Sequence, residues 1–256
     1  MDLKAWARAE APAFLLALQF LTRLPVTAPY SPEAQAASPR WYAGAGVAVG
    51  LIAGAVFWAA ALVWPQPVAA LLALAVGLVV TGGLHEDGFA DACDGLGGVR
   101  PKERVLEIMR DSRIGTYGVL GLAMMLGGRV TVLAALPGTA VPFVLVAGHA
   151  VSRAAMVWVM ASSDYVRPSG AASSVAGGLD QRAIKVTLGT VALALVPLVF
   201  VLPLAAVVAG VLGLAAGHWL MRRWYEPRLG GYTGDCLGAV QQMSEIGFLL
   251  GVLALL

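Results

Sequence analysis

The stretch from Trp41 to Leu84 contains no aspartate, glutamate, lysine or arginine. A helix that crosses a membrane needs about 20 mostly apolar residues, so this stretch is long enough for two such helices. Pro65 and Pro67 divide it, and two prolines at this spacing are typical of a turn. The stretch therefore predicts two membrane-spanning helices joined by a short loop.

The whole chain has the composition of a multi-span membrane protein. Of its 256 residues, 59% are hydrophobic and 12% are charged, whereas soluble domains contain roughly 25% charged residues. A soluble domain of this length could not bury so much apolar surface, and two cysteines are too few for a disulfide framework. A net charge of +2 gives no reason to expect a nucleic acid partner.

We therefore expect an all-α polytopic membrane bundle that forms one catalytic domain, residues 1–256. The apolar segments predict about seven spans, at residues 43–64, 67–84, 115–136, 139–161, 185–202, 204–221 and 237–256.

The N-terminal segment, residues 1–40, precedes the first predicted span. Its apolar part, residues 13–26, is short, contains Arg23 and ends in prolines, which favours an interfacial helix over a span. Alternate loops contain 15 of the 17 lysines and arginines. By the positive-inside rule, these loops and the N-terminus face the cytoplasm and the C-terminus lies outside.

The densest polar cluster, residues 85–95, lies where the second predicted span meets the cytoplasm. Asp87, Asp91 and Asp94 follow one another at i, i+4 and i+7, which places them on one face of a helix. Three carboxylates on one face repel each other unless a cation joins them, and Mg²⁺ commonly bridges carboxylates to phosphates. The spacing predicts a magnesium site. A solvated acidic loop and a cation or proton pathway are the alternative interpretations.

A second polar segment, residues 110–118, begins with Arg110, Asp111, Ser112 and Arg113. Guanidinium groups fit phosphate oxygens, so this segment is a candidate phosphate site. The alternative is a positively charged membrane anchor. Asp111 is either a further metal ligand or a partner of Arg113.

Two glycine-rich loops follow. Residues 230–239 contain Thr233, Gly234 and Asp235, and glycines let backbone amides approach a phosphate or another ligand. Asp235 is either a helix cap or, beside the acidic cluster, a metal ligand or general base. Residues 168–178 predict a flap over a substrate or a simple linker.

Charged side chains also occur inside the predicted spans. An unpaired charge at that depth is costly, so these side chains should face the interior of the bundle. Glu245 and Arg153 are expected either to pair with each other or to line a substrate cavity, with His149 on the same helix face as Arg153. Arg129 is expected to snorkel or to form a buried pair.

Four segments, residues 21–26 (Leu-Thr-Arg-Leu-Pro-Val), 85–95, 110–118 and 230–239, occur in this order. Together they resemble the cobalamin synthase family, adenosylcobinamide-GDP ribazoletransferase, over nearly the whole chain. The resemblance implies an enzyme of late vitamin B12 biosynthesis in the bacterial inner membrane, with its active site facing the cytoplasm. Such an enzyme joins adenosylcobinamide-GDP to α-ribazole or its 5′-phosphate with magnesium and releases GMP.

Phosphoryl transfer needs metal and cationic groups that neutralise charge and hold the attack in line. The expected magnesium ligands are Asp87, Asp91, Asp94 and Glu86. The expected phosphate- and substrate-binding residues are Arg110, Arg113, Arg153, Ser112, Gly234 and Thr233. The candidate bases for the attacking ribose hydroxyl are, in order, Asp235, His85 and Asp111. Arg110 stands where the family usually has a lysine, which keeps the charge but changes its geometry.

Two other function classes stay open from the residues alone. Asp91-x-x-Asp94-Gly95 begins like the motif of membrane CDP-alcohol phosphotransferases, but the continuation of that motif is absent. A transporter would favour acidic residues inside spans over a cluster at one face. The expected partners are the two small-molecule substrates and membrane lipid, and a homo-oligomer is compatible with the sequence.

Overall fold

The structure is a computed structural model that describes residues 3–167, 175 and 179–256. The predicted flap, residues 168–178, lies outside the described residues except for Val175. The described elements are α1 (Leu3–Leu21), α2 (Pro32–Ala37), η1 (Ser38–Trp41), α3 (Tyr42–Ala61), α4 (Gln66–Thr81), α5 (Leu84–Leu96), α6 (Lys102–Ile108), α7 (Thr116–Ala135), α8 (Val141–Ser162), α9 (Gln181–Leu195), α10 (Leu198–Val201), α11 (Leu204–Leu229) and α12 (Gly234–Ala254). The predicted all-α class is confirmed.

Six helices in the described part of the chain are long and apolar enough to cross a membrane, or seven if the bent pair α4 and α5 counts as one span. Each predicted span corresponds to a candidate span or to a helix, but one predicted boundary is wrong. The predicted span 185–202 corresponds to the candidate span Gln181–Val201, in which α9 and the short helix α10 are separated at Pro197, which has no N–H to donate. Helix α11 continues to Leu229, beyond the predicted end at residue 221.

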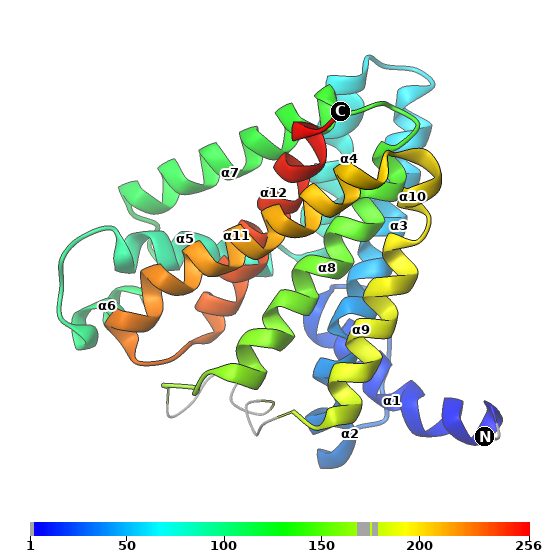
Figure 1. The fold of residues 1–256 in the computed structure, drawn as a ribbon. Helices are drawn as coiled ribbons and strands as arrows, with labels where there is room; N and C mark the ends of the chain where they lie inside the picture. Colours follow the sequence, from blue (N-terminus) through cyan, green and yellow to red (C-terminus); the bar gives the residue numbers. More distant parts are fainter. Residues whose placement is uncertain (1–2, 168–174, 176–178) are drawn as a thin grey trace.

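The arrangement of the ends agrees with the predicted topology. Figure 1 places the N-terminus at one end of the bundle and the C-terminus at the other. The uncharged connections between α3 and α4, between α7 and α8, and between α10 and α11 lie at the same end as the C-terminus. Which side of the membrane the basic segments face stays a prediction of the charge pattern.

Small residues let the helices pack closely, as expected where no hydrophobic driving force acts between helices in lipid. A Cβ atom on Gly213 of α11 would lie 2.1 Å from the carbonyl oxygen of Gly247 on α12. Large apolar side chains on the outside are exposed, including Met124 at 77%, Leu193 at 76% and Phe200 at 82%. These side chains form the surface expected to face lipid.

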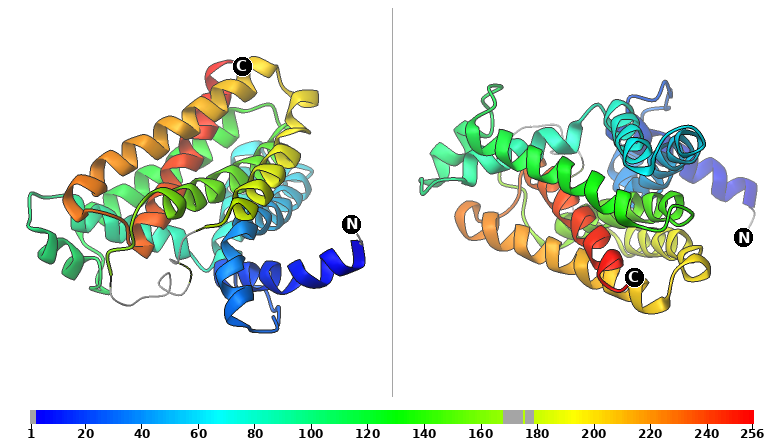
Figure 2. Two further views of the ribbon diagram at one scale, coloured as in Figure 1. Left: turned by 60° about the horizontal axis from the view of Figure 1, so that its bottom comes forward. Right: turned by 90° about the horizontal axis from the view of Figure 1, so that it is seen from above.

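Helix α1 corresponds to the predicted interfacial helix but ends at Leu21, short of residue 26. Its last turns pack on the bundle through buried apolar side chains such as Ala17 and Leu21. Buried Glu10 accepts a hydrogen bond from Trp41 Nε1 at 2.7 Å and pairs with Arg40 at 3.2 Å. Figure 2 shows the start of α1 projecting sideways from the bundle. Its place in a membrane interface stays a prediction.

Candidate functional site

Helix α5, which carries the acidic cluster, runs at 90° to α4. The bend is made by Gly82 and Gly83, which both have φ +68°, a backbone region that glycine adopts without steric cost. Helix α5 therefore does not continue the crossing of α4 but lies between α7 and α12 (Figure 1). The predicted helical placement of the acidic residues is confirmed.

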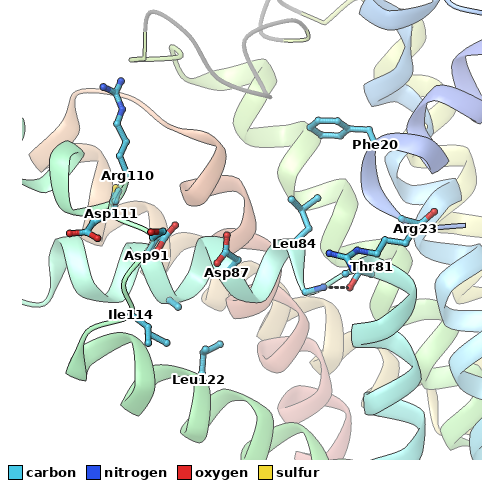
Figure 3. A pocket seen from close by; sticks show the side chains of 16 residues that line it. Phe20, Arg23, Thr81, Leu84, Asp87, Asp91, Arg110, Asp111, Ile114 and Leu122 are labelled. Atoms are coloured by element: carbon cyan, nitrogen blue, oxygen red, sulfur yellow. Dashed lines mark hydrogen bonds between the residues drawn. The ribbon is translucent and has the colours of Figure 1, made fainter.

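A cavity of about 820 Å³ opens beside α5. Residues from three of the segments singled out in the sequence contribute to its wall, namely Thr22 and Arg23, then Asp87 and Asp91, then Arg110, Asp111 and Ser112. Figure 3 shows Asp87 and Asp91 on the same side of α5, with Asp111 beyond Asp91 and Arg23 at the opposite end. Segments far apart in the sequence thus meet at one cavity.

Arg23 owes its position to the glycine bend. Its backbone N–H donates to the carbonyl oxygen of Val80 at 2.7 Å. Its side chain passes directly over Gly82, where a Cβ atom would lie 2.2 Å from the Arg23 Nε. The guanidinium group therefore reaches the cavity across a turn that no larger residue would permit.

A third carboxylate, Asp235, approaches from the first turn of α12. Glycine at position 88 makes this possible, because a Cβ there would lie 2.9 Å from the Asp235 Cα. The charges of Asp87 and Asp235 both repel that of Asp91, and Asp87 also repels Asp235. The structure therefore places Asp87, Asp91 and Asp235 near one another, and Asp235 was among the candidate metal ligands.

Asp94 has a different role from the one predicted. Its two carboxylate oxygens accept the backbone N–H groups of Gly115 at 2.7 Å and Gly118 at 2.9 Å. These N–H groups lie at the N-terminus of α7 and have no partner within the helix, so Asp94 caps α7 from another helix. Asp94 thereby fixes the end of the loop that carries Arg110 and Ser112.

Glu86 also departs from the predicted ligand set. Its side chain accepts from Gln242 Nε2 at 2.8 Å and lies 3.4 Å from Arg129 Nη1. It faces the interior of the bundle, whereas Asp87 and Asp91 face the cavity. Within the described residues, no group of three or more His, Cys, Asp and Glu side chains is close enough to hold a metal ion by itself.

Arg113 and Asp111 bind each other. The guanidinium donates to Asp111 through Nε at 2.9 Å and Nη2 at 2.6 Å, and the Arg113 side chain is 86% exposed. Hydrogen bonds from Arg113 lower the pKa of Asp111 to about 2. A carboxylate of such low pKa is a weak base, which counts against the role considered for Asp111. Arg113 points to solvent, and Arg110 and Ser112 line the cavity.

A smaller cavity of about 140 Å³ adjoins the first and shares Phe20, Leu84 and Asp87 with it. Gly234 and Asp235 line this smaller cavity, and their contact with a substrate stays a prediction. Thr233 is instead buried beneath it, where its hydroxyl caps α12 by accepting the N–H of Cys236 at 3.3 Å.

Asp235 is held by Arg167, which the sequence indicates only as one of the basic residues of the loops expected to face the cytoplasm. Arg167 Nη2 donates to Asp235 Oδ2 at 2.6 Å. Arg167 is positioned by the parallel β-bridge between Tyr165 and Tyr232, with the Val166 N–H donating to the Tyr232 carbonyl at 3.0 Å. Arg167 and Arg23 are thus the cavity-lining cations whose site roles sequence reasoning missed. For Arg23, membership of the 21–26 motif was an available signal.

The remaining predicted residues lie deeper. His85 forms part of the wall of the smaller cavity but is 2% exposed, and its Nε2 is buried without a hydrogen-bond partner among the described residues. Arg153 is also buried, and donates to the His149 carbonyl at 3.1 Å rather than facing either cavity. The Nε2 atom of His85 is buried although the residue forms part of the wall, so this nitrogen is poorly placed to take a proton from a substrate.

Of the two alternatives for Glu245 and Arg153, a direct pair with each other is absent from the ion pairs of the described residues. Glu245 forms its ion pair with Arg129 Nη2 and lies 3.4 Å from the Nδ1 of His149. Arg129 was expected to snorkel or to form a buried pair, and the buried pair is confirmed at 4% side-chain exposure. These charges compensate one another inside the bundle instead of lining the cavities.

Comparisons with known proteins show the family of the chain. The model of the cobalamin-5-phosphate synthase family matches residues 13–253. The chain belongs to the cobalamin-5-phosphate synthase family. The resemblance drawn from four short segments is thereby confirmed over almost the whole chain.

Relatives with one shared name cover almost the whole chain. Proteins named adenosylcobinamide-GDP ribazoletransferase are 45% identical in Leptothrix cholodnii, over 96% of both chains, and 40% identical in Shewanella frigidimarina, over 97% of this chain and 96% of the relative. The relative of that name from Vibrio parahaemolyticus is 36% identical over 98% of this chain and 95% of its own. No solved structure matches the chain.

Proposed function

We propose that this protein transfers the adenosylcobinamide phosphate moiety of adenosylcobinamide-GDP to α-ribazole or α-ribazole 5′-phosphate and releases GMP. The name shared by the relatives, adenosylcobinamide-GDP ribazoletransferase, supports the donor and the ribazole acceptor. The observation that carries the proposal is the meeting of carboxylates and arginines from separate segments around Asp87. Such a mixture of hard oxygen ligands and cations is what transfer of a charged phosphoryl group requires.

In this reaction a ribose hydroxyl oxygen forms a bond to the phosphorus that carries cobinamide. The bond from that phosphorus to the bridging oxygen of the pyrophosphate breaks, and the bridging oxygen leaves with GMP. The hydroxyl proton passes to a base. Catalysis then depends on holding the attack in line and on neutralising the phosphate charge.

The acidic pair Asp87 and Asp91 fits a magnesium ion. Both carboxylates line the same cavity, and neither takes part in an ion pair among the described residues. Their mutual repulsion favours a cation between them. When bound, Mg²⁺ would neutralise charge on the pyrophosphate and orient it. Asp94 and Glu86 would support this site from outside, through the end of α7 and the interior of the bundle.

Three arginines are placed to bind phosphate oxygens. Arg23 and Arg110 line the larger cavity, and Arg167 lines the smaller one. Because Arg167 is already engaged with Asp235, its first role is to orient that carboxylate. Asp235 is our candidate for the base that takes the hydroxyl proton, since it lies at the cavity and is held in one geometry.

We place the site at the cytoplasmic face of a bacterial inner membrane. The support is the basic composition of the loops that surround it, which follows the positive-inside rule. A water-soluble, GDP-linked substrate would then reach the cavity directly from the cytoplasm.

The test is GMP release by the purified full chain in lipid nanodiscs supplied with adenosylcobinamide-GDP, α-ribazole and Mg²⁺. We expect GMP and a corrinoid product in equal amounts, both dependent on α-ribazole. GMP formation without any corrinoid–nucleoside product, or no reaction with either acceptor, would contradict the proposal.

A further inference from the structure

The two adjoining cavities differ in size and chemistry. The larger, about 820 Å³, is lined by hydroxyl and charged groups from Thr22, Arg23, Thr81 and the Arg110–Ser112 loop beside apolar side chains such as Ile114 and Leu122. The smaller, about 140 Å³, is lined mostly by apolar and aromatic side chains, including Phe20, which it shares with the larger cavity, and Met156, Tyr165 and Leu237, together with the charged groups of Asp87, Arg167 and Asp235. Two different chemical groups are therefore expected to fill them.

From this difference we infer that the smaller cavity is the acceptor subsite, in which the benzimidazole base of the acceptor nucleoside lies against Tyr165 and Met156 with its ribose toward Asp235. The inference rests on the proposed function and assigns the two substrates to the two cavities. The larger cavity then receives the guanosine diphosphate portion of the donor.

The bases themselves support this assignment. Guanine carries several hydrogen-bonding groups on its edges, and burying them against Phe20, Met156 and Leu237 would leave them unsatisfied at substantial cost. The benzene edge of a benzimidazole has no such groups, and an aromatic ring packs well against Tyr165 and a methionine sulfur. A cavity of about 140 Å³ also suits one base better than the whole donor.

The position of Asp87 supports the same division. Asp87 lines both cavities, so a phosphate joined to it through a magnesium ion would lie at their junction. In-line transfer requires the attacking hydroxyl and the leaving oxygen on opposite sides of the phosphorus. An acceptor in the smaller cavity and GMP in the larger one satisfy that requirement.

The polar edge of the smaller cavity matches a ribose. Asp235 is held by Arg167 at 2.6 Å, and Gly234 lies beside it at the start of α12. A carboxylate accepts hydrogen bonds from sugar hydroxyls. Tyr165 is kept in place by its ring contact with Tyr232, with the ring centroids 5.4 Å apart.

The test compares Tyr165→Leu with Ile114→Ala in the full chain in nanodiscs. Ile114 is the matched control because it lines the larger cavity only. We expect Tyr165→Leu to weaken α-ribazole binding, measured by calorimetry without the donor, by about tenfold, the scale of losing one ring from a base contact. Ile114→Ala should change it less than about twofold and raise the KM for adenosylcobinamide-GDP instead. Weaker α-ribazole binding in Ile114→Ala, or unchanged binding in Tyr165→Leu, would overturn the assignment.

A competition on the unaltered protein keeps the inference testable if Tyr165→Leu does not fold. Free benzimidazole should displace α-ribazole, and GMP should not. Displacement by GMP with none by benzimidazole would assign the smaller cavity to the donor and overturn the inference. If the protein binds α-ribazole but releases no GMP when both substrates are present, the proposed reaction is refuted. If Tyr165→Leu turns over with an unchanged KM for the acceptor, only the assignment of the smaller cavity is refuted.

Discussion

Among single residues, aspartates on one face of helix α5 have different roles. Asp87, Asp91 and Asp94 share the spacing that predicts a common site, and the helix that this spacing requires is present. Asp94 nevertheless binds Gly115 and Gly118, because the N-terminus of α7 arrives opposite the last turn of α5. Periodicity identifies a face of a helix, but it cannot reveal which neighbour each position on that face meets.

Asp111 provides a prediction at the same scale. Its pKa is lowered to about 2 by hydrogen bonds from Arg113, so the carboxyl is ionised throughout the neutral range. Because folding lowers this pKa, the pair stabilises the folded protein at every pH above the pKa that Asp111 has in the unfolded chain. That stabilisation is lost only as the pH falls toward 2. We expect Asp111→Asn to leave the pH profile of GMP release between pH 5 and 9 unchanged, in shape and midpoint. A profile that loses its acidic limb in this variant would show that Asp111 titrates during catalysis.

At the scale of the elements, a buried polar network joins α5, α7, α8 and α12. Arg129 pairs with Glu245, and Gln242 links both Arg129 and Glu86 at 3.2 and 2.8 Å. The network fixes the first turn of α5, next to Asp87. Sequence reasoning predicted that these span charges turn inward, because their cost in lipid demands it. The partners could not be predicted, since they depend on how α7 and α8 are rotated against α12.

Removing one member of that network leaves the other charge buried and unpaired. Arg129→Met should therefore lower the free energy of unfolding by about 3–5 kcal/mol, and the double variant Arg129→Met, Glu245→Leu should recover part of that loss. The matched control is Glu226→Gln, whose i,i+4 pair with Arg222, with side chains 30% and 19% exposed, should contribute about 0.5 kcal/mol or less. Denaturant unfolding in detergent measures all three. Equal effects of Arg129→Met and Glu226→Gln would refute a stabilising buried network.

For the molecule as a whole, hydropathy and charge predict most of the fold. Hydropathy predicts about seven spans, and the described residues contain six or up to seven candidate spans. The charge pattern predicts which loops face the cytoplasm. Both patterns missed the right-angle bend at Gly82 and Gly83, because a pair of glycines after an apolar run also fits an ordinary helix end. That bend is what lays α5 beside the cavity, so the site could be located in the sequence but its shape could not.

The topology makes a direct prediction. Val99, 102% exposed between α5 and α6, should lie in the cytoplasm, and Val63, 71% exposed after α3, should lie outside. Both native cysteines are buried, so single cysteines can be introduced into the natural chain. A membrane-impermeant maleimide should label Val63→Cys in intact spheroplasts and Val99→Cys only after the membrane is opened. The reverse labelling would invert the orientation of the site.

The central claim is that Asp87 and Asp91 hold a divalent ion at the junction of the two cavities while Asp94 does not. Paramagnetic resonance of Mn²⁺ titrated into the full chain tests it most directly, with the wild type, Asp91→Asn and Asp94→Asn compared at matched folding by thermal unfolding. The account predicts that Asp91→Asn weakens Mn²⁺ binding by at least about tenfold and that Asp94→Asn leaves the affinity within about threefold of the wild type. Unchanged binding in Asp91→Asn, or a larger loss in Asp94→Asn, would contradict it.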